Sequence, residues 1–216
     1  MRLLSLTISL LIVFSFTSYT EDTVNLTPFQ ENDLWGYKEQ NDNISIEARY
    51  IFAYEFSEYG IAVVCDPLEG WIYIDKDGEF VIKPMIVDNY YDEFSEGLAR
   101  FEEDGKIGFF NQKGQVVIDP IYEYAHPFKN GFAQVARGVK KERMGEYTFI
   151  EVDKWGFINK KGELAIPYRY DKVLSPFSEY DFAVVIIEGK EIVIDREGEI
   201  IEEGVITEVT AKVEIK

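Results

Sequence analysis

Short apolar runs separated by polar turns recur along most of this chain. Four of these turns begin with Asp or Asn and end with Gly, and they are Asp75–Gly78, Asn111–Gly114, Asn159–Gly162 and Asp195–Gly198. Their glycines lie 36, 48 and 36 residues apart, and Glu39–Asp42 forms a degenerate first copy another 36 residues earlier. This spacing predicts a repeat with five copies and one 12-residue insertion.

Each tetrapeptide has the composition of a hairpin turn. The first side chain accepts a hydrogen bond from the backbone two residues on, and the final Gly adopts the left-handed conformation. The flanks, such as Trp71–Ile74 and Phe80–Ile82, are short, aromatic and β-branched, which predicts antiparallel strands. We expect Pro84, Pro120 and Pro167 to end the second strand of their repeats, because proline cannot donate to a ladder.

A second recurrent element combines a Phe, a polar turn, an apolar residue and an Ala. Its copies begin at Phe56, Phe94, Phe128 and Phe177, and each predicts an anchored turn that enters a third strand. After the first 20 residues, no stretch sustains a helical period. We therefore predict an all-β fold with three strands per repeat and about 13 to 15 strands in all.

These residues resemble the bacterial WG-repeat (KWG) family, whose unit runs Trp-Gly-Phe-Ile-Asn-Lys-x-Gly, a strand ending in Pro, a Tyr, then Phe-Ser-Glu-Gly-Leu-Ala. Lys154–Ala183 matches this unit most fully, and the resemblance extends over about residues 34–198. The repeat-defining positions are Trp35, Gly36, Trp71, Gly78, Gly108, Gly114, Trp155, Gly156, Gly162 and Gly198. The resemblance implies a binding or structural module, often on exported or envelope proteins, with no catalytic residues of its own.

Several copies depart from the family pattern. The Trp-Gly pair is complete only at Trp35-Gly36 and Trp155-Gly156. The second copy, Trp71-Ile72, lacks the Gly, the third, Ile107-Gly108, lacks the Trp, and the fifth, Glu191-Ile192, lacks both. These departures weaken individual copies and leave the period intact.

Repeats of this size bury their faces only by stacking on their neighbours. We expect an open, curved, solenoid-like array of three-stranded antiparallel repeats over residues 34–204, and a closed, propeller-like ring is the alternative. Residues 21–33 would cap the first end. The alternating segment 205–216 would add a half-buried capping strand with its charges outward.

The first 20 residues differ from the rest. Arg2 precedes the uncharged run Leu3–Phe16, and Thr17–Thr20 follows as a small-polar stretch, which is the layout of a secretory signal peptide. The apolar run is too short to cross a bilayer comfortably. We expect cleavage after Thr20 and export, with an uncleaved anchor or a buried first helix as alternatives.

Composition narrows the choice of partner. Forty acidic residues against 22 basic ones give a net charge of −18, and 46% of the residues are hydrophobic, so we expect a folded acidic protein. Such a charge argues against sequence-independent binding to nucleic acid or anionic lipid. A lone Cys65 and a lone His126 exclude disulfide frameworks and multi-Cys metal sites, and we expect no cofactor.

The 12-residue insertion lies within residues 137–152 and carries Arg137, Lys140, Lys141 and Arg143. Insertions in repeat proteins form loops, often on the binding face. We interpret this one as a basic hairpin that contacts a partner, and the acidic surface of a second copy is one candidate. The alternative is a solvated hairpin without a role.

Aromatic residues make up 15% of the chain. Most recur at repeat-equivalent positions, which indicates core. The linkers that contain Tyr90 and Tyr91, Tyr122 and Tyr124, and Tyr168 and Tyr170 are less regular, and they are candidates for an exposed aromatic surface that suits interface contacts. Of these residues, Tyr90, Tyr91 and Tyr124 are our candidate partner contacts.

Candidate chemistry is sparse. Asp75–Glu79 resembles part of a calcium-binding loop. If Gly78 took the sixth position of such a loop, Tyr73 and Pro84 would occupy the first and twelfth positions, which need carboxylates. No nucleophile, phosphate-loop or zincin motif occurs. We predict an exported, non-enzymatic scaffold that binds a protein or an envelope component. The alternative binds or cleaves glycans with exposed aromatics and paired acids such as Glu102-Glu103 or Glu202-Glu203.

Overall fold

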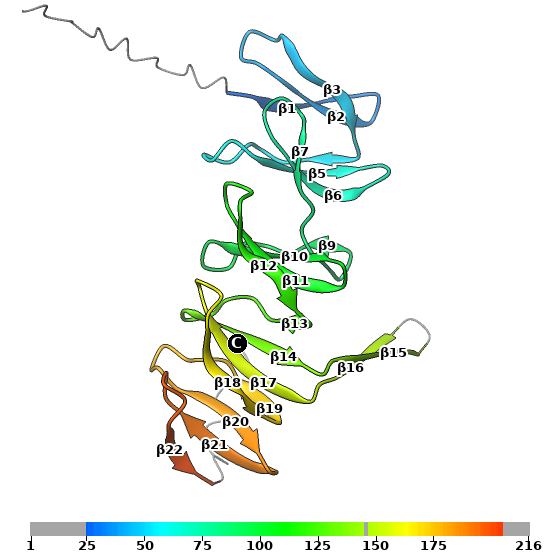
Figure 1. Cartoon of the computed structure of the whole chain (residues 1–216). Coiled ribbons are helices and arrows are strands. Elements are labelled where there is room, and N and C mark those ends of the chain that lie inside the picture. Colours follow the sequence, from blue (N-terminus) through cyan, green and yellow to red (C-terminus); the bar gives the residue numbers. More distant parts are fainter. Residues whose placement is uncertain (1–24, 145–146, 205–216) are drawn as a thin grey trace, which may run out of the picture.

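A computed structural model describes residues 25–144 and 147–204, and within them five small antiparallel sheets follow one another along a column (Figure 1). The first and last sheets lie at opposite ends, so the array is open and does not close into a ring. The described residues contain no helix, and hence none that could cross a membrane. The predicted leader and the predicted capping strand 205–216 lie outside the described residues.

Sheets 1 and 2 are built from β1 (Thr27–Glu31), β2 (Leu34–Lys38) and β3 (Ile44–Tyr50), and from β4 (Phe52–Ala53), β5 (Ala62–Asp66), β6 (Gly70–Ile74) and β7 (Phe80–Ile82). Sheet 3 is built from β10 (Leu98–Glu103), β11 (Lys106–Asn111) and β12 (Val116–Tyr122). Sheets 4 and 5 are built from β13 (Tyr124–Ala125), β14 (Phe132–Arg137), β17 (Lys154–Asn159) and β18 (Leu164–Tyr170), and from β19 (Lys172–Ser175), β20 (Ala183–Ile187), β21 (Lys190–Ile194) and β22 (Ile200–Glu203).

Two hairpins stand apart from the five sheets. One pairs β8 (Ile86–Val87) with β9 (Tyr90–Tyr91), and the other pairs β15 (Lys140–Met144) with β16 (Tyr147–Glu151). These hairpins and the short first strands of sheets 2, 4 and 5 bring the described strands to 22, above the 13 to 15 predicted. Three strands in each sheet carry the repeat, as the sequence predicts.

The hydrophobic core consists of four separate clusters, one at each junction between neighbouring sheets. At the junction of sheets 1 and 2, for example, Tyr37 and Ile46 pack with Val64 and Ile74. Val63, the neighbour of Val64 on β5, points to the opposite face and joins the next cluster. Each of the three inner sheets is therefore buried on two faces by stacking, which explains why its central strand is apolar at consecutive positions.

The four predicted turns have the expected geometry. The Asp75 carboxylate accepts hydrogen bonds from the amides of Asp77 and Glu79 at 3.0 and 2.9 Å, and Gly78 has a φ of 79°. The turns that begin at Asn111, Asn159 and Asp195 repeat these bonds. Asp75 begins the segment that resembled a calcium loop. In the structure its carboxylate instead accepts hydrogen bonds from the turn's own backbone amides.

The turn glycines also face the preceding sheet. A Cβ on Gly114 would stand 2.2 Å from Val81 Cγ1, and one on Gly162 would stand 3.0 Å from Ile118 Cγ2. Asp42 holds the equivalent position in sheet 1, with a φ of 65°, and no described sheet precedes it. The first copy of the turn therefore tolerates a side chain, which explains its degenerate sequence.

The glycine of the Trp-Gly pair serves a different purpose. Trp155 pairs with Tyr170 and Phe157 pairs with Ile166, so β18 holds two extra residues opposite Gly156. A Cβ on Gly156 would lie 2.7 Å from the Ile166 carbonyl oxygen. Gly36 and Gly108 make the same close approach in sheets 1 and 3. The glycine thus admits a bulge in the neighbouring strand.

Two of the expected strand ends are wrong. Pro120 and Pro167 do not stop their strands, because β12 runs on to Tyr122 and β18 to Tyr170. Both prolines fall inside the bulge, where the ladder needs no amide donor. Pro84 does follow the end of β7 at Ile82, and sheet 2 lacks the bulge as well as the glycine.

Continuation through the bulge places a tyrosine against the next turn. The Tyr122 hydroxyl donates to the Gly162 carbonyl at 2.7 Å. At the first junction, Arg49 donates to the Gly78 carbonyl at 2.9 Å and to the Tyr50 hydroxyl at 2.8 Å. Arg169 and Tyr170 repeat this arrangement with Gly198. At three of the four junctions, therefore, a side chain donates a hydrogen bond to the turn-glycine carbonyl, and we call this bond the polar fastening. The donor is a tyrosine at one junction and an arginine bonded to a tyrosine at the other two.

Candidate interaction surfaces

The junction between sheets 2 and 3 departs from the other three. Ile72 and Ile86 occupy the positions that hold a bulge glycine and a fastening tyrosine elsewhere. Because β7 ends at Ile82, residues 83–93 leave the sheet and form the β8–β9 hairpin. This hairpin brings Tyr90 and Tyr91 beside sheet 2.

Five aromatic side chains gather at this junction, and we call them the aromatic surface: Phe52, Tyr54, Trp71, Tyr90 and Tyr91. Phe52 and Trp71 both pair with Cys65 across β4, β5 and β6, so the three side chains share one face of sheet 2. The Trp71 ring centroid lies 5.2 Å from that of Tyr90 and 5.2 Å from that of Tyr91. The hairpin and the sheet thus contribute to one cluster.

Hydrogen bonds fix the cluster while leaving it open to solvent. The Tyr54 and Tyr90 hydroxyls are 2.7 Å apart, and the Trp71 indole donates to the Asn89 carbonyl at 3.2 Å. Phe52, Tyr54 and Tyr90 nevertheless remain 53%, 42% and 36% exposed. Ile86 and Val87 of β8 are exposed as well, which extends the apolar area.

The electrostatics of the aromatic surface favour neutral tyrosines. The hydrogen bond to Tyr90 raises the pKa of Tyr54, burial raises the pKa of Tyr91, and Glu93 adds to both effects. The hydroxyls therefore keep their protons at neutral pH and remain able to donate as well as accept. Cys65 is half-buried, and burial raises the pKa of its thiol, which disfavours the reactive thiolate.

The basic insertion forms the β15–β16 hairpin, which projects sideways from the column at sheet 4 (Figure 1). Lys140 and Lys141 are exposed along it. Arg137 lies at its base, 4.0 Å from the Asp153 carboxylate and above the Tyr168 ring. The side chain of Arg143, the fourth predicted contact, lies outside what the structure describes.

Tyr124 belongs to a second aromatic group. Its ring lies 5.2 Å from His126 and 5.8 Å from Trp155, and His126 stacks on Trp155 at 5.5 Å. The structure therefore places Tyr124 on sheet 4, away from Tyr90 and Tyr91. Two other linker tyrosines, Tyr122 and Tyr170, are buried, so the expectation of an exposed aromatic surface does not extend to them.

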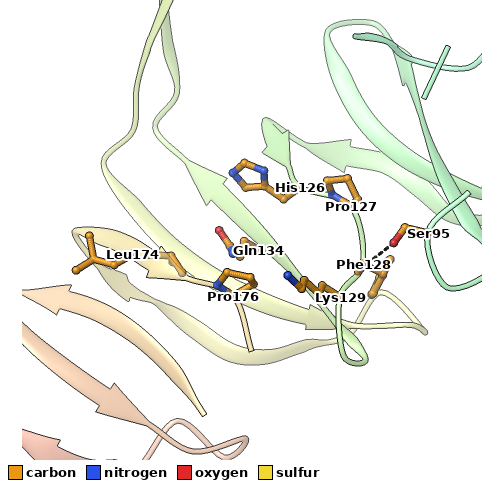
Figure 2. Close-up of a pocket in the computed structure, with 9 residues that line it drawn as sticks. Ser95, His126, Pro127, Phe128, Lys129, Gln134, Leu174 and Pro176 are labelled. Carbon is orange, nitrogen blue, oxygen red and sulfur yellow. Dashed lines mark hydrogen bonds between the residues drawn. The ribbon is translucent and has the colours of Figure 1, made fainter. Parts of the chain in front are cut away.

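A pocket of about 540 Å³ adjoins His126 and spans sheets 3, 4 and 5 (Figure 2). Its lining includes Ser95, His126, Lys129, Gln134 and Leu174. No group of three or more potential metal ligands occurs among the described residues. Sequence patterns alone do not reveal this pocket, because it depends on how sheets 4 and 5 stack.

The paired acids do not face each other. Glu102 and Glu103 are consecutive on β10, and Glu202 and Glu203 are consecutive on β22. Successive side chains of a strand point to opposite faces of the sheet. Neither pair thus presents two carboxylates on one face, as hydrolysis of a glycosidic bond requires.

Taken together, a column of antiparallel sheets, a glycine that admits a bulge and a repeated turn define a β-repeat protein. The family model for the WG containing repeat matches residues 35–66, 71–106, 107–138 and 155–190, which is more than half of the chain. The chain therefore belongs to the WG-repeat family.

Other comparisons add little. The search among curated proteins found no match. A solved structure described as the AfRom2 CNH domain aligns with 83% of this chain and 84% of that chain, at 12% identity and a TM-score of 0.20. A likeness this distant carries no argument about fold or function.

Proposed function

We propose that this WG-repeat protein is an exported, non-enzymatic scaffold that binds another protein or a component of the cell envelope. The observation that carries the proposal is the aromatic surface at the junction of sheets 2 and 3. Proteins seldom leave large apolar side chains exposed together unless that area meets a partner. Tyr and Trp are enriched at such interfaces, because they combine apolar area with a polar tip.

The leader supports export, because Arg2 and the uncharged run Leu3–Phe16 have the composition of a signal peptide. The mature chain would start near Glu21. N-terminal sequencing of the protein recovered outside the cytoplasm tests this part, and an intact Met1 on that protein would contradict cleavage.

The binding role is tested by pull-down from the envelope fraction of the source organism. The double variant Tyr54→Ser/Tyr90→Ser removes two exposed rings and their mutual hydrogen bond. Tyr180→Ser is the matched control, since Tyr180 is 75% exposed in the turn between β19 and β20. We expect the double variant to lose a partner that the wild type and the control retain. Equal capture by all three proteins would contradict a role for this surface.

The basic hairpin is the second candidate contact. Charge reversal at Lys140 and Lys141 should weaken partner binding while leaving the melting temperature unchanged, because both side chains are exposed. Lys113→Glu, which reverses an exposed lysine on the turn of sheet 3, is the control. Unchanged binding after reversal of both hairpin lysines would favour a solvated hairpin without a role.

Glycan binding is the alternative function. Phe52 and Trp71 are nearly parallel, with an interplanar angle of 20° and centroids 6.2 Å apart, and exposed aromatic faces of this kind suit sugar rings. A glycan array distinguishes the two functions, and glycan binding should disappear in a Phe52→Ser variant, because that change removes the more exposed ring of the pair. Binding to no glycan, together with partner capture, would leave the scaffold as the function.

A further inference from the structure

The pocket at sheets 3 to 5 is separate from the aromatic surface and from the basic hairpin. One wall of the pocket is the loop that joins β13 to β14, which contributes Pro127, Phe128 and Lys129. The opposite wall comes from sheet 5 and consists of Val173, Leu174 and Pro176. The Ser95 hydroxyl donates to the Phe128 carbonyl at 2.7 Å, and this bond holds the β13–β14 loop against sheet 3. The pocket is thus formed where three repeats meet.

Three polar side chains surround the pocket. Figure 2 shows the His126 ring, the Gln134 amide and the Lys129 ammonium around one space beside Leu174 and Pro176. Each of the three carries an N–H donor. Burial, together with the nearby Arg100, lowers the pKa of His126, so at neutral pH the ring is uncharged and Lys129 supplies the positive charge.

Lys129 is the basic side chain of the pocket lining. Within the described residues, it takes part in none of the ion pairs, although acids outnumber bases by 40 to 22 in the chain. Its ammonium is exposed at the pocket rim and available to an anion. Opposite it, Leu174 is 47% exposed, and with Val173 and Pro176 it forms an apolar wall.

We propose that this pocket binds a carboxylate attached to a small apolar group. The carboxylate accepts hydrogen bonds from Lys129 and from the Gln134 amide or the His126 ring, and the apolar group packs on Leu174 and Pro176. Binding sites for small ligands combine an apolar lining with a few placed polar groups in this way. Two sources share this chemistry, a free small carboxylic acid and the C-terminal residue of a polypeptide.

Isothermal titration of the full chain tests the proposal with three probes. N-acetyl-leucine carries the acid and the apolar group, whereas N-acetyl-leucinamide lacks only the charge. We expect the acid to bind about tenfold tighter than the amide, as a charge-assisted hydrogen bond implies. Equal affinities, or no binding of the acid, would overturn the proposal.

The third probe, acetyl-Gly-Gly-Gly-Leu with a free C-terminus, separates the two sources. Tighter binding of this peptide than of N-acetyl-leucine identifies a polypeptide C-terminus as the ligand. Equal binding of the two identifies a free small acid.

Variants assign the binding to the pocket. Lys129→Gln should weaken N-acetyl-leucine binding about tenfold, and Leu174→Asp should abolish it through charge repulsion. Both positions are exposed, so folding is retained, and the melting temperature checks this. Lys113→Gln is the matched control and should bind as the wild type does. If Lys129→Gln binds as tightly as this control, the pocket is not the site.

Discussion

Two neighbouring junctions, between sheets 3 and 4 and between sheets 2 and 3, are formed by copies of the same repeat unit. The two copies differ at two positions of that unit. At the former, Gly108 admits the bulge, and β12 continues to Tyr122, which fastens the next turn. At the latter, Ile72 stands in place of the glycine and Ile86 in place of the tyrosine. Strand β7 of sheet 2 consequently ends early, and the β8–β9 hairpin follows outside the sheet.

This difference shows how a repeat protein can acquire a distinct surface. Where the bulged strand continues, the next sheet covers its tyrosine. Where the strand ends early, the released segment carries Tyr90 and Tyr91 to the outside, and they join Trp71 of the same imperfect repeat. The loss of these two repeat positions therefore coincides with an exposed aromatic cluster.

The largest expected effect concerns the ion pair that anchors the released segment. Arg100 and Asp92 are both buried, with an N–O distance of 2.5 Å, and Arg100 also donates to the Ala125 carbonyl of sheet 4. Asp92→Asn leaves the arginine charge buried without its partner. We expect a loss of about 3–5 kcal/mol in the free energy of unfolding, measured with urea.

The exposed pair Lys83–Glu69 is the control for this measurement, and Glu69→Gln should cost less than about 1 kcal/mol. If Asp92→Asn costs no more than this control, the released segment is held by something other than the buried pair.

The bulge glycine gives the next largest effect. A Cβ on Gly108 would lie 2.6 Å from the Ile118 carbonyl oxygen, so Gly108→Ala should cost about 1–3 kcal/mol. The bulge also positions Tyr122. The effects of Gly108→Ala and Tyr122→Phe on the free energy of unfolding should therefore be non-additive in a double-mutant cycle. The first change already disturbs the hydrogen bond from Tyr122 to the Gly162 carbonyl that the second change deletes. Strict additivity would show that the glycine and the tyrosine act independently.

The fastening hydrogen bond contributes less. Tyr122→Phe removes the donor to the Gly162 carbonyl and should lower the free energy of unfolding by about 0.5–1.5 kcal/mol. Tyr180→Phe, at a hydroxyl on an exposed side chain, should leave stability unchanged. A loss of the same size from both variants would argue against a special role for Tyr122.

The smallest effect appears only at alkaline pH. Burial raises the pKa of Tyr122 above that of an unfolded tyrosine, which is about 10. The folded state therefore holds this proton more tightly, and the associated stability is complete below about pH 10 and is lost as the pH rises through the folded pKa. Tyr122→Phe should make stability fall less steeply above about pH 10 in urea titrations. An unchanged slope would mean that this hydroxyl does not titrate differently on folding.

Much of the fold follows from the sequence because it depends on local chemistry. The turns at Gly78 and Gly162 need only a first-position acceptor and a left-handed glycine, and both are visible in the chain. The period then gives the number of stacked sheets. The irregular linkers were candidates for an exposed aromatic surface, and among their tyrosines Tyr90 is exposed whereas Tyr122 and Tyr170 are buried.

The remaining features depend on contacts between distant segments. The sequence marks Ile72 as a departure, but only the approach of Gly108 to the Ile118 carbonyl explains why that position needs glycine. Contacts between distant segments also decide the environment of the linker tyrosines. Tyr122 and Tyr90 occupy similar linkers, yet Tyr122 is buried and Tyr90 is exposed. The pocket beside His126 escapes prediction because residues from three sheets line it.

The four separate core clusters have a consequence for how the molecule resists disruption. Because no cluster extends past two adjacent sheets, cohesion passes along the column from neighbour to neighbour. Sheets 1 and 5 each bury one such face, whereas the three inner sheets bury two. Local opening therefore starts at the outer sheets, and a load applied along the column is carried by each junction in series.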